Sequence, residues 1–193
     1  MEADWEVEIG GDAPVIDAGW SGLVDLVRQP ERIGEIAEAA AFPPLAACLL
    51  CLNGAVSPVW TSKCDFWETL DAGSFDADEM DAASASAACG SGGYIDLLRR
   101  EASSWQSPDM LVAECRNLCA QLRAVPLRNC RVDLVVRQAC FSPDSTGLGI
   151  TAYVTACGAS PTAARISLGR AFESFAATVA EPSNAQNGNS PVQ

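Results

Sequence analysis

The sequence contains no histidine, and it has a single lysine, Lys63, beside eleven arginines. Without histidine the chain cannot build a Ser-His-Asp triad, use an imidazole general base or bind a metal through imidazole. An alanine- and arginine-rich bias of this kind indicates a bacterial genome rich in GC. The scarcity of lysine therefore needs no functional cause.

Long apolar runs are also missing. The most apolar stretch, 37–52, is too short to cross a bilayer and is interrupted by Glu38, Pro43 and Pro44. The N-terminal MEADWEVEIG is acidic and lacks the basic and apolar regions of a secretory signal. We therefore expect a cytoplasmic protein that does not enter the membrane, and we expect its nine cysteines to be buried thiols rather than disulfides.

What the chain does have is apolar residues and an excess of acid. Hydrophobic residues make up 49% of the 193 positions, which is enough for a sizeable core. The net charge of −13 disfavours nucleic acid and anionic membranes as partners and favours a basic protein, a cation or simply solubility. We predict one domain over 1–180, followed by a polar, disordered tail at 181–193.

The apolar periodicity predicts alternating strands and helices. Period-two patterns and β-formers predict strands at 5–9, 23–28, 59–68, 94–100, 129–140 and 150–157, the last two forming a hairpin. Helix signals predict helices at 30–52, 76–88, 107–124 and 160–179, and CGSGG at 89–93 predicts a flexible break. This pattern indicates an α+β two-layer sandwich, in which a mixed, mostly antiparallel sheet of about six strands carries helices mainly on one face.

A short motif occurs twice. GLVDLVR at 22–28 is matched seventy-one positions later by GYIDLLR at 93–99. In both copies a helical cysteine, Cys51 or Cys119, is followed after twelve residues by a base and two residues later by an acid. The likeness suggests an internal duplication of a βαβ-like unit, with pseudo-repeats at 20–68 and 91–138.

Aspartate is disfavoured in strands, yet the predicted strands contain four. Because side chains alternate between faces, the bases and acids of each strand fall on a common side. We predict that this polar sheet face carries a ligand-binding set: Asp25, Lys63, Asp65, Asp96, Arg131, Asp133, Arg137 and Tyr153. The alternative is a solvent-exposed sheet face on which these side chains form cross-strand ion pairs and bind no ligand. Asp25 and Asp96 have apolar neighbours on their own face, which would raise their pKa unless a base meets them.

Two cysteine pairs have spacings that place each pair on one side of a helix. Cys48 and Cys51 form a C-x-x-C, and Cys115 and Cys119 are four residues apart. Together they could supply four thiolates to a metal or iron–sulfur centre. Their wide separation in sequence and the absence of neighbouring turn glycines favour a packing role instead. We therefore expect no metal and no cofactor.

Three classes of function remain open. The first is a non-catalytic binding or accessory protein that turns its polar sheet face or acidic surface toward a protein partner, and the lack of every familiar catalytic signature favours it. The second is a small enzyme or metabolite-binding protein that uses Asp, Lys and Arg on the same face. The third is a cysteine-ligated metal or redox protein. Trp60 and Trp67 are predicted on opposite strand faces, so that one of them would mark a contact surface.

Overall fold

The computed structural model describes residues 1–10, 15–70, 75–83, 87–101, 105, 107–142 and 145–180. Its strands are β1 (Glu2–Glu8), β2 (Ile16–Asp17), β3 (Val59–Leu70), β4 (Cys89–Arg99), β5 (Cys130–Ser142) and β6 (Ser145–Gly158). The helices are η1 (Pro30–Glu35), α1 (Ala37–Ala41), α2 (Pro43–Leu52), η2 (Asp78–Met80), α3 (Pro108–Ala124) and α4 (Pro161–Ala180), where η marks a 3-10 helix. The predicted disordered tail, 181–193, lies outside the described residues.

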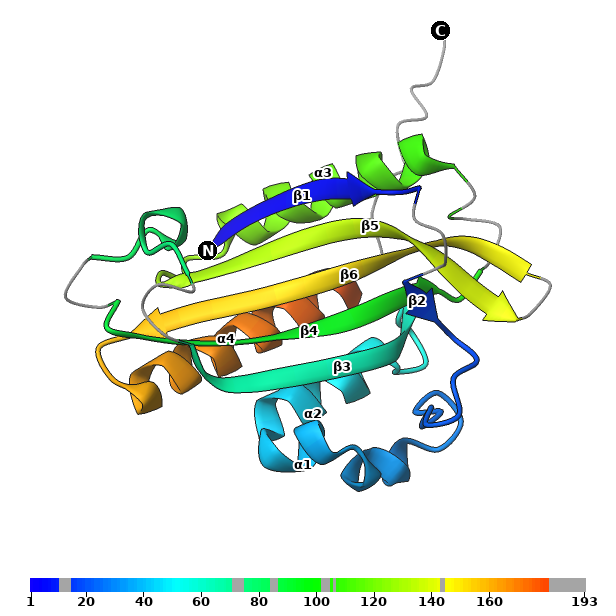
Figure 1. The fold of residues 1–193 in the computed structure, drawn as a ribbon, viewed down its shortest axis with the longest axis horizontal. Helices are drawn as coiled ribbons and strands as arrows, with labels where there is room; N and C mark the ends of the chain where they lie inside the picture. The colour runs from blue at the N-terminus through cyan, green and yellow to red at the C-terminus, as the bar shows by residue number, and fades with distance from the viewer. Residues whose placement is uncertain are drawn as a thin grey trace, which may run out of the picture.

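All six strands belong to one sheet in the order β1-β5-β6-β4-β3, with the short β2 beside β5 (Figure 1). β1 and β2 run parallel to β5, whereas the pairs β5–β6, β6–β4 and β4–β3 are antiparallel. The sheet is thus mixed and mostly antiparallel, and β5 and β6 form the expected hairpin. The predicted fold class is confirmed.

The three long helices cover one face of the sheet. Figure 1 shows α4 behind the central strands, α3 behind β1 and α2 beside β3. Alternate residues of the central strands point into this helical layer, including Leu134 of β5 and Ala152 of β6, which are fully buried. Phe172 and Phe175 of α4 are also fully buried among them. Burial of these apolar side chains is the main force that holds the two layers together.

A second, smaller apolar cluster closes one end of the opposite face. Ile16 of β2 packs with Leu98 of β4 and Ala139 of β5, and Trp60 lies against them. The Ser62 hydroxyl donates to the backbone oxygen of Asp17 at 2.6 Å, which fastens this segment to β3. The rest of the face opposite the long helices carries mainly polar and aromatic side chains, and we call it the open face.

In both outer strands, β1 and β3, some backbone N–H and C=O groups form hydrogen bonds with side chains. In β1 the Asp4 carboxylate accepts from the Trp5 N–H at 2.8 Å, and the Arg123 guanidinium donates to the Ala3 oxygen at 2.9 Å. In β3 the Asp65 carboxylate accepts from the Phe66 N–H at 2.7 Å. These backbone groups would otherwise be available to an added strand.

One predicted strand is wrong. Residues 23–28 form turns, in which the Asp25 carboxylate accepts from the N–H groups of Val27 and Arg28, each at 3.1 Å. This local side-chain bonding competes with strand pairing. The segment 20–68 therefore lacks the first strand of a βαβ unit. In the segment 91–138, β4 and β5 are parallel and joined through α3, with β6 between them. The internal duplication is not confirmed.

Two further expectations fail around β3 and β4. Residues 89–93 are the first half of β4 rather than a flexible break. Glycine at 93 is needed there, because a Cβ would lie 2.5 Å from the backbone oxygen of Asp65. A bulge in β3 between Thr61 and Cys64 shifts the alternation, so Trp60 and Trp67 lie on the same face and not on opposite faces. The predicted helix at 76–88 is limited to the 3-10 turn η2 within the described residues.

Candidate functional site

The open face carries a row of polar and aromatic side chains, one from each strand. The backbone register aligns them in the order Asp65, Tyr94, Tyr153, Asp133 and Asp4 across β3, β4, β6, β5 and β1. Side chains that are paired in this way point to the same side of a sheet. The structure therefore brings Asp65 of β3 onto the same face as Asp133 of β5, whereas Lys63 lies within the bulge of β3 and has no partner in this register.

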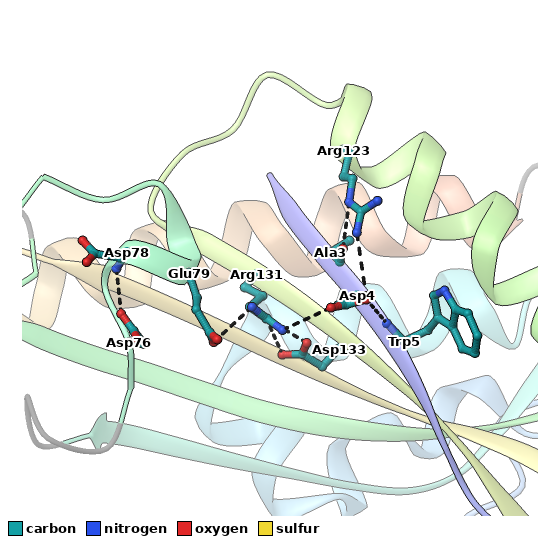
Figure 2. Close-up of polar contacts among 9 residues, drawn as sticks. All are labelled: Ala3, Asp4, Trp5, Asp76, Asp78, Glu79, Arg123, Arg131 and Asp133. Carbon is teal, nitrogen blue, oxygen red and sulfur yellow. Dashed lines mark hydrogen bonds and ion pairs between the residues drawn. The ribbon is translucent and has the colours of Figure 1, made fainter.

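Arg131 is the centre of the charge network on this face (Figure 2). Its Nε donates to both carboxylate oxygens of Asp133, at 2.7 and 2.9 Å. Its Nη1 lies 3.0 Å from Glu79 of η2, and its Nη2 lies 3.9 Å from Asp4 of β1. Burial raises the pKa of Asp133, although Arg131 opposes the shift. One guanidinium thus holds three carboxylates together.

Arg137 forms a second charge cluster farther along β5. It donates to the Glu8 carboxylate at 2.6 Å and to the Tyr153 hydroxyl at 2.9 Å. Its guanidinium carbon lies 5.5 Å from the centre of the Tyr153 ring, within the range of a cation–π contact. The Tyr153 ring is followed by Tyr94 at 5.9 Å and then Trp67 at 6.0 Å, measured between ring centres. An aromatic row therefore crosses the face beside the charges.

Asp96 is the most deeply placed acid of the face. It is 4% exposed and accepts a hydrogen bond from the Thr151 hydroxyl at 2.7 Å. Burial raises its pKa, while the Thr151 hydrogen bond and the charges of Lys63 and Arg137 act in the opposite direction. The expectation from its apolar neighbours is thus confirmed for Asp96. Lys63 itself lies 5.6 Å from the Trp20 ring centre.

The raised pKa of Asp96 predicts how the free energy of unfolding changes with pH. Above about pH 4 the carboxyl of Asp96 ionises in the unfolded chain before it ionises in the folded protein. The unfolded state then binds fewer protons, so the contribution of Asp96 to the free energy of unfolding falls as pH rises through this window. We expect Asp96→Asn to remove this fall and Thr151→Val, which deletes the opposing hydrogen bond, to steepen it. Urea unfolding from about pH 4 to about pH 8 measures both slopes, and parallel curves for the two variants would contradict the assignment.

Part of the open face is hollowed. A depression of about 400 Å³ lies over β1, β5 and β6 and is lined by Asp4, Trp5, Glu6, Arg131, Asp133, Val135 and Tyr153. A separate cavity of about 360 Å³ lies beside β3, and its lining includes Trp20, Lys63 and Tyr94. Of the predicted residues, Arg131, Asp133 and Tyr153 line the first hollow and Lys63 lines the second, so they are not gathered in one pocket. The other four, Asp25, Asp65, Asp96 and Arg137, line neither hollow.

Asp25 does not belong to this face. It lies in the turn at 23–28 and forms an ion pair with Arg28 at 3.6 Å. Conversely, the acids of β1 were not among the predicted residues, although all of them are exposed and point to the open face beside β5: Glu2, Asp4, Glu6 and Glu8. The signal for them is visible in the printed sequence, because acids alternate with other residues throughout EADWEVE.

The two cysteine pairs lie in different helices, and three of the four thiols are buried, whereas Cys51 is exposed. Cys48 lies buried in α2, and burial raises its pKa well above the ordinary thiol value. In α3, burial raises the pKa of Cys115 to about 12 and that of Cys119 to about 11. Thiols held in the protonated form are poor metal ligands and poor nucleophiles. Among the residues that the structure describes, no three His, Cys, Asp or Glu side chains gather in a way that could hold a metal ion.

Comparison with protein-family models, with curated proteins and with solved structures finds no match to this chain. Within the described part of the chain, no helix has the length and apolar character that a membrane crossing requires. A function must therefore be inferred from the residues of the chain itself.

Proposed function

We propose that the protein is a non-catalytic binding protein whose open face receives an extended, basic segment of a partner protein. The supporting observation is the surplus of exposed carboxylates on that face. The four acids of β1 are all exposed; Asp4 and Glu8 lie beside Arg131 and Arg137, whereas Glu2 and Glu6 form no ion pair in the described part of the chain. Arg131 and Arg137 are themselves already paired with acids of the face. A partner that brings arginine or lysine would therefore meet carboxylates rather than repelling bases.

The spacing of the acids favours an extended segment. Alternate residues of a strand are about 7 Å apart, and the side chains of β1 from Glu2 to Glu8 follow this repeat for about 20 Å. An extended peptide presents its own alternate side chains at the same repeat. Basic side chains at these positions could pair with the acids of β1 and lie against the Tyr153 ring, which adds a cation–π contact.

The experiment uses a defined peptide in place of the unknown partner. We expect a fluorescent peptide of alternating arginine and threonine to bind the wild-type protein with an affinity that falls as salt is added. The double variant Glu2→Lys, Glu6→Lys should bind about tenfold or more weakly, equivalent to about 1.4 kcal/mol or more. Fluorescence anisotropy at several salt concentrations measures this loss.

A matched control variant distinguishes the effect of the open-face acids on peptide binding from the effect of the protein's net charge. Glu31 of η1 and Asp109 of α3 are exposed acids outside the open face, and Glu31→Lys with Asp109→Lys changes the net charge by the same amount. This control should keep nearly the whole affinity. Equal losses in the two double variants would show that the peptide responds only to the overall negative charge, and the proposal would fail.

The hollow lined by Asp4, Glu6, Asp133 and Tyr153 favours one further candidate, a small organic cation such as a polyamine or an arginine-like metabolite. The same anisotropy assay distinguishes it. A small cation of this class would displace the peptide at low concentration and would bind the protein with a stoichiometry of one.

A further inference from the structure

A further hollow lies on the other side of the molecule, between α2 and α4. Its volume is about 790 Å³. Apolar or small side chains line most of it, among them Pro44, Ala47, Cys51, Ala176 and Ala177. This size and this lining are typical of sites that bind small, largely apolar ligands.

The groove is narrow because the two helices touch along its floor. A Cβ on Gly169 would lie 3.0 Å from the Cγ of Pro44, and the Cys51 sulfur lies 3.9 Å from the backbone oxygen of Ala176. The two contacts are seven residues apart in each helix, so α2 and α4 run side by side in the same direction. From Thr162 to Ala177 the groove follows α4 for about 22 Å, at a rise of 1.5 Å per residue.

The groove has a basic end. Arg165 and Arg170 line it toward its Pro44 end, whereas the one acid in the lining, Glu173, lies farther along α4 toward Ala176. Arg165 is held by an ion pair with Glu68 and by the backbone oxygen of Ala41. Arg170 is exposed, and no ion pair joins it to another residue in the described part of the chain. It is the cation available to a ligand.

We infer that this groove binds a single-chain anionic amphiphile of the fatty-acid class. The carboxylate would pair with Arg170, and the alkyl chain would lie along Ala47, Cys51, Ala176 and Ala177. The charge complementarity is local: Arg170 supplies it at this end of the groove, against the net charge of −13 of the whole chain. The two helices touch along the floor of the groove, so an α-helix of about 10 Å diameter would protrude from it, whereas an alkyl chain fits into it. The segment 181–193, which follows α4, is too polar in sequence to fill an apolar groove.

The test measures binding of decanoate, dodecanoate and tetradecanoate by isothermal titration calorimetry. We expect one saturable site and a dissociation constant that falls about threefold or more for each added methylene, as burial of alkyl chain requires. Arg170→Glu should weaken dodecanoate binding severalfold. The cationic dodecyltrimethylammonium should bind the wild type more weakly than dodecanoate and should prefer the Arg170→Glu variant.

Two matched variants locate the site. Ala177 is exposed in the groove, and Ala120 is exposed on α3. Ala177→Trp should abolish dodecanoate binding, and Ala120→Trp should leave it unchanged. Alkylation of Cys51, followed by peptide mass spectrometry, should slow when dodecanoate is bound, because this exposed thiol lines the groove. This readout is independent of the calorimetry.

Several results would overturn the inference: no saturable binding, equal binding by the two tryptophan variants, or equal affinity for anionic and cationic chains. A dimer of the wild type that Ala177→Trp dissociates would assign the groove to a second copy instead. The groove and the open face lie on opposite sides of the sheet, so failure of one proposal leaves the other standing.

Discussion

Replacing Phe172 with alanine is expected to lower the free energy of unfolding by about 4 kcal/mol, because it leaves a cavity where the two layers meet. The Phe172 ring is fully buried and lies 6.2 Å from the Phe42 ring, measured between centres. A Cβ on Gly93 would lie 3.3 Å from the same ring, so the side chain also reaches β4. Urea unfolding followed by circular dichroism measures the loss.

Two controls show whether burial is the cause of this loss. Phe172→Leu keeps part of the volume and should cost less than the alanine variant. Met110→Ala removes an apolar side chain that is 59% exposed on α3, and it should change the free energy of unfolding by no more than about 0.5 kcal/mol. Equal losses at positions 172 and 110 would mean that Phe172 does not join the layers as described.

The second large effect is expected at the centre of the open face. Arg131→Gln leaves the carboxylates of Asp4, Glu79 and Asp133 close together without their shared cation. We expect a loss of about 2 kcal/mol. That figure lies between the costs for exposed and for fully buried ion pairs, because the side chains of Arg131 and Asp133 are 22% and 34% exposed.

A double-mutant cycle measures the interaction energy between Arg131 and Asp133. If Arg131 stabilises the fold mainly through Asp133, then Asp133→Asn should recover part of the stability that Arg131→Gln loses. The recovery should also shrink at low pH, where protonation removes the carboxylate charges that Arg131 compensates. Strictly additive losses across the cycle would show that the two side chains are in contact but not energetically coupled.

Much of the fold follows from local sequence signals. The strands around Leu134 and Ala152 were predicted because apolar and polar residues alternate there, and this alternation alone fixes which side faces the helices. The α3 and α4 helices were predicted from a serine followed by proline at each start, Ser107-Pro108 and Ser160-Pro161. These signals are short-range, and tertiary contacts reinforce them.

The failures have long-range causes. Gly93 resembles a flexible position in sequence, and only the approach of the β3 backbone shows why a strand needs glycine there. The bulge in β3 depends on pairing with β4, so the common face of Trp60 and Trp67 was not visible in the alternation. Asp25 and Asp96 occupy equivalent places in the repeated motif, yet one bonds to its own turn and the other is buried against Thr151.

The candidate site was predicted in part for the same reason. Alternation correctly indicated that the acids and bases of β5 lie together, because they belong to one strand. The position of β1 beside β5 could not be read from the sequence, since residues 9–129 lie between these two strands. The acids that support the proposed function were therefore missed, although they stand at the very start of the sequence.

The hydrogen bonds between side chains and backbone groups of the two outer strands have a consequence for assembly. Asp4 and Asp65 occupy N–H groups at the two lateral margins of the sheet, and Arg123 occupies a carbonyl there. Growth of the sheet by recruiting neighbouring chains would first have to break these bonds, so the margins resist fibre formation. A partner is therefore expected to bind a face of the sheet rather than to pair with its outer strands.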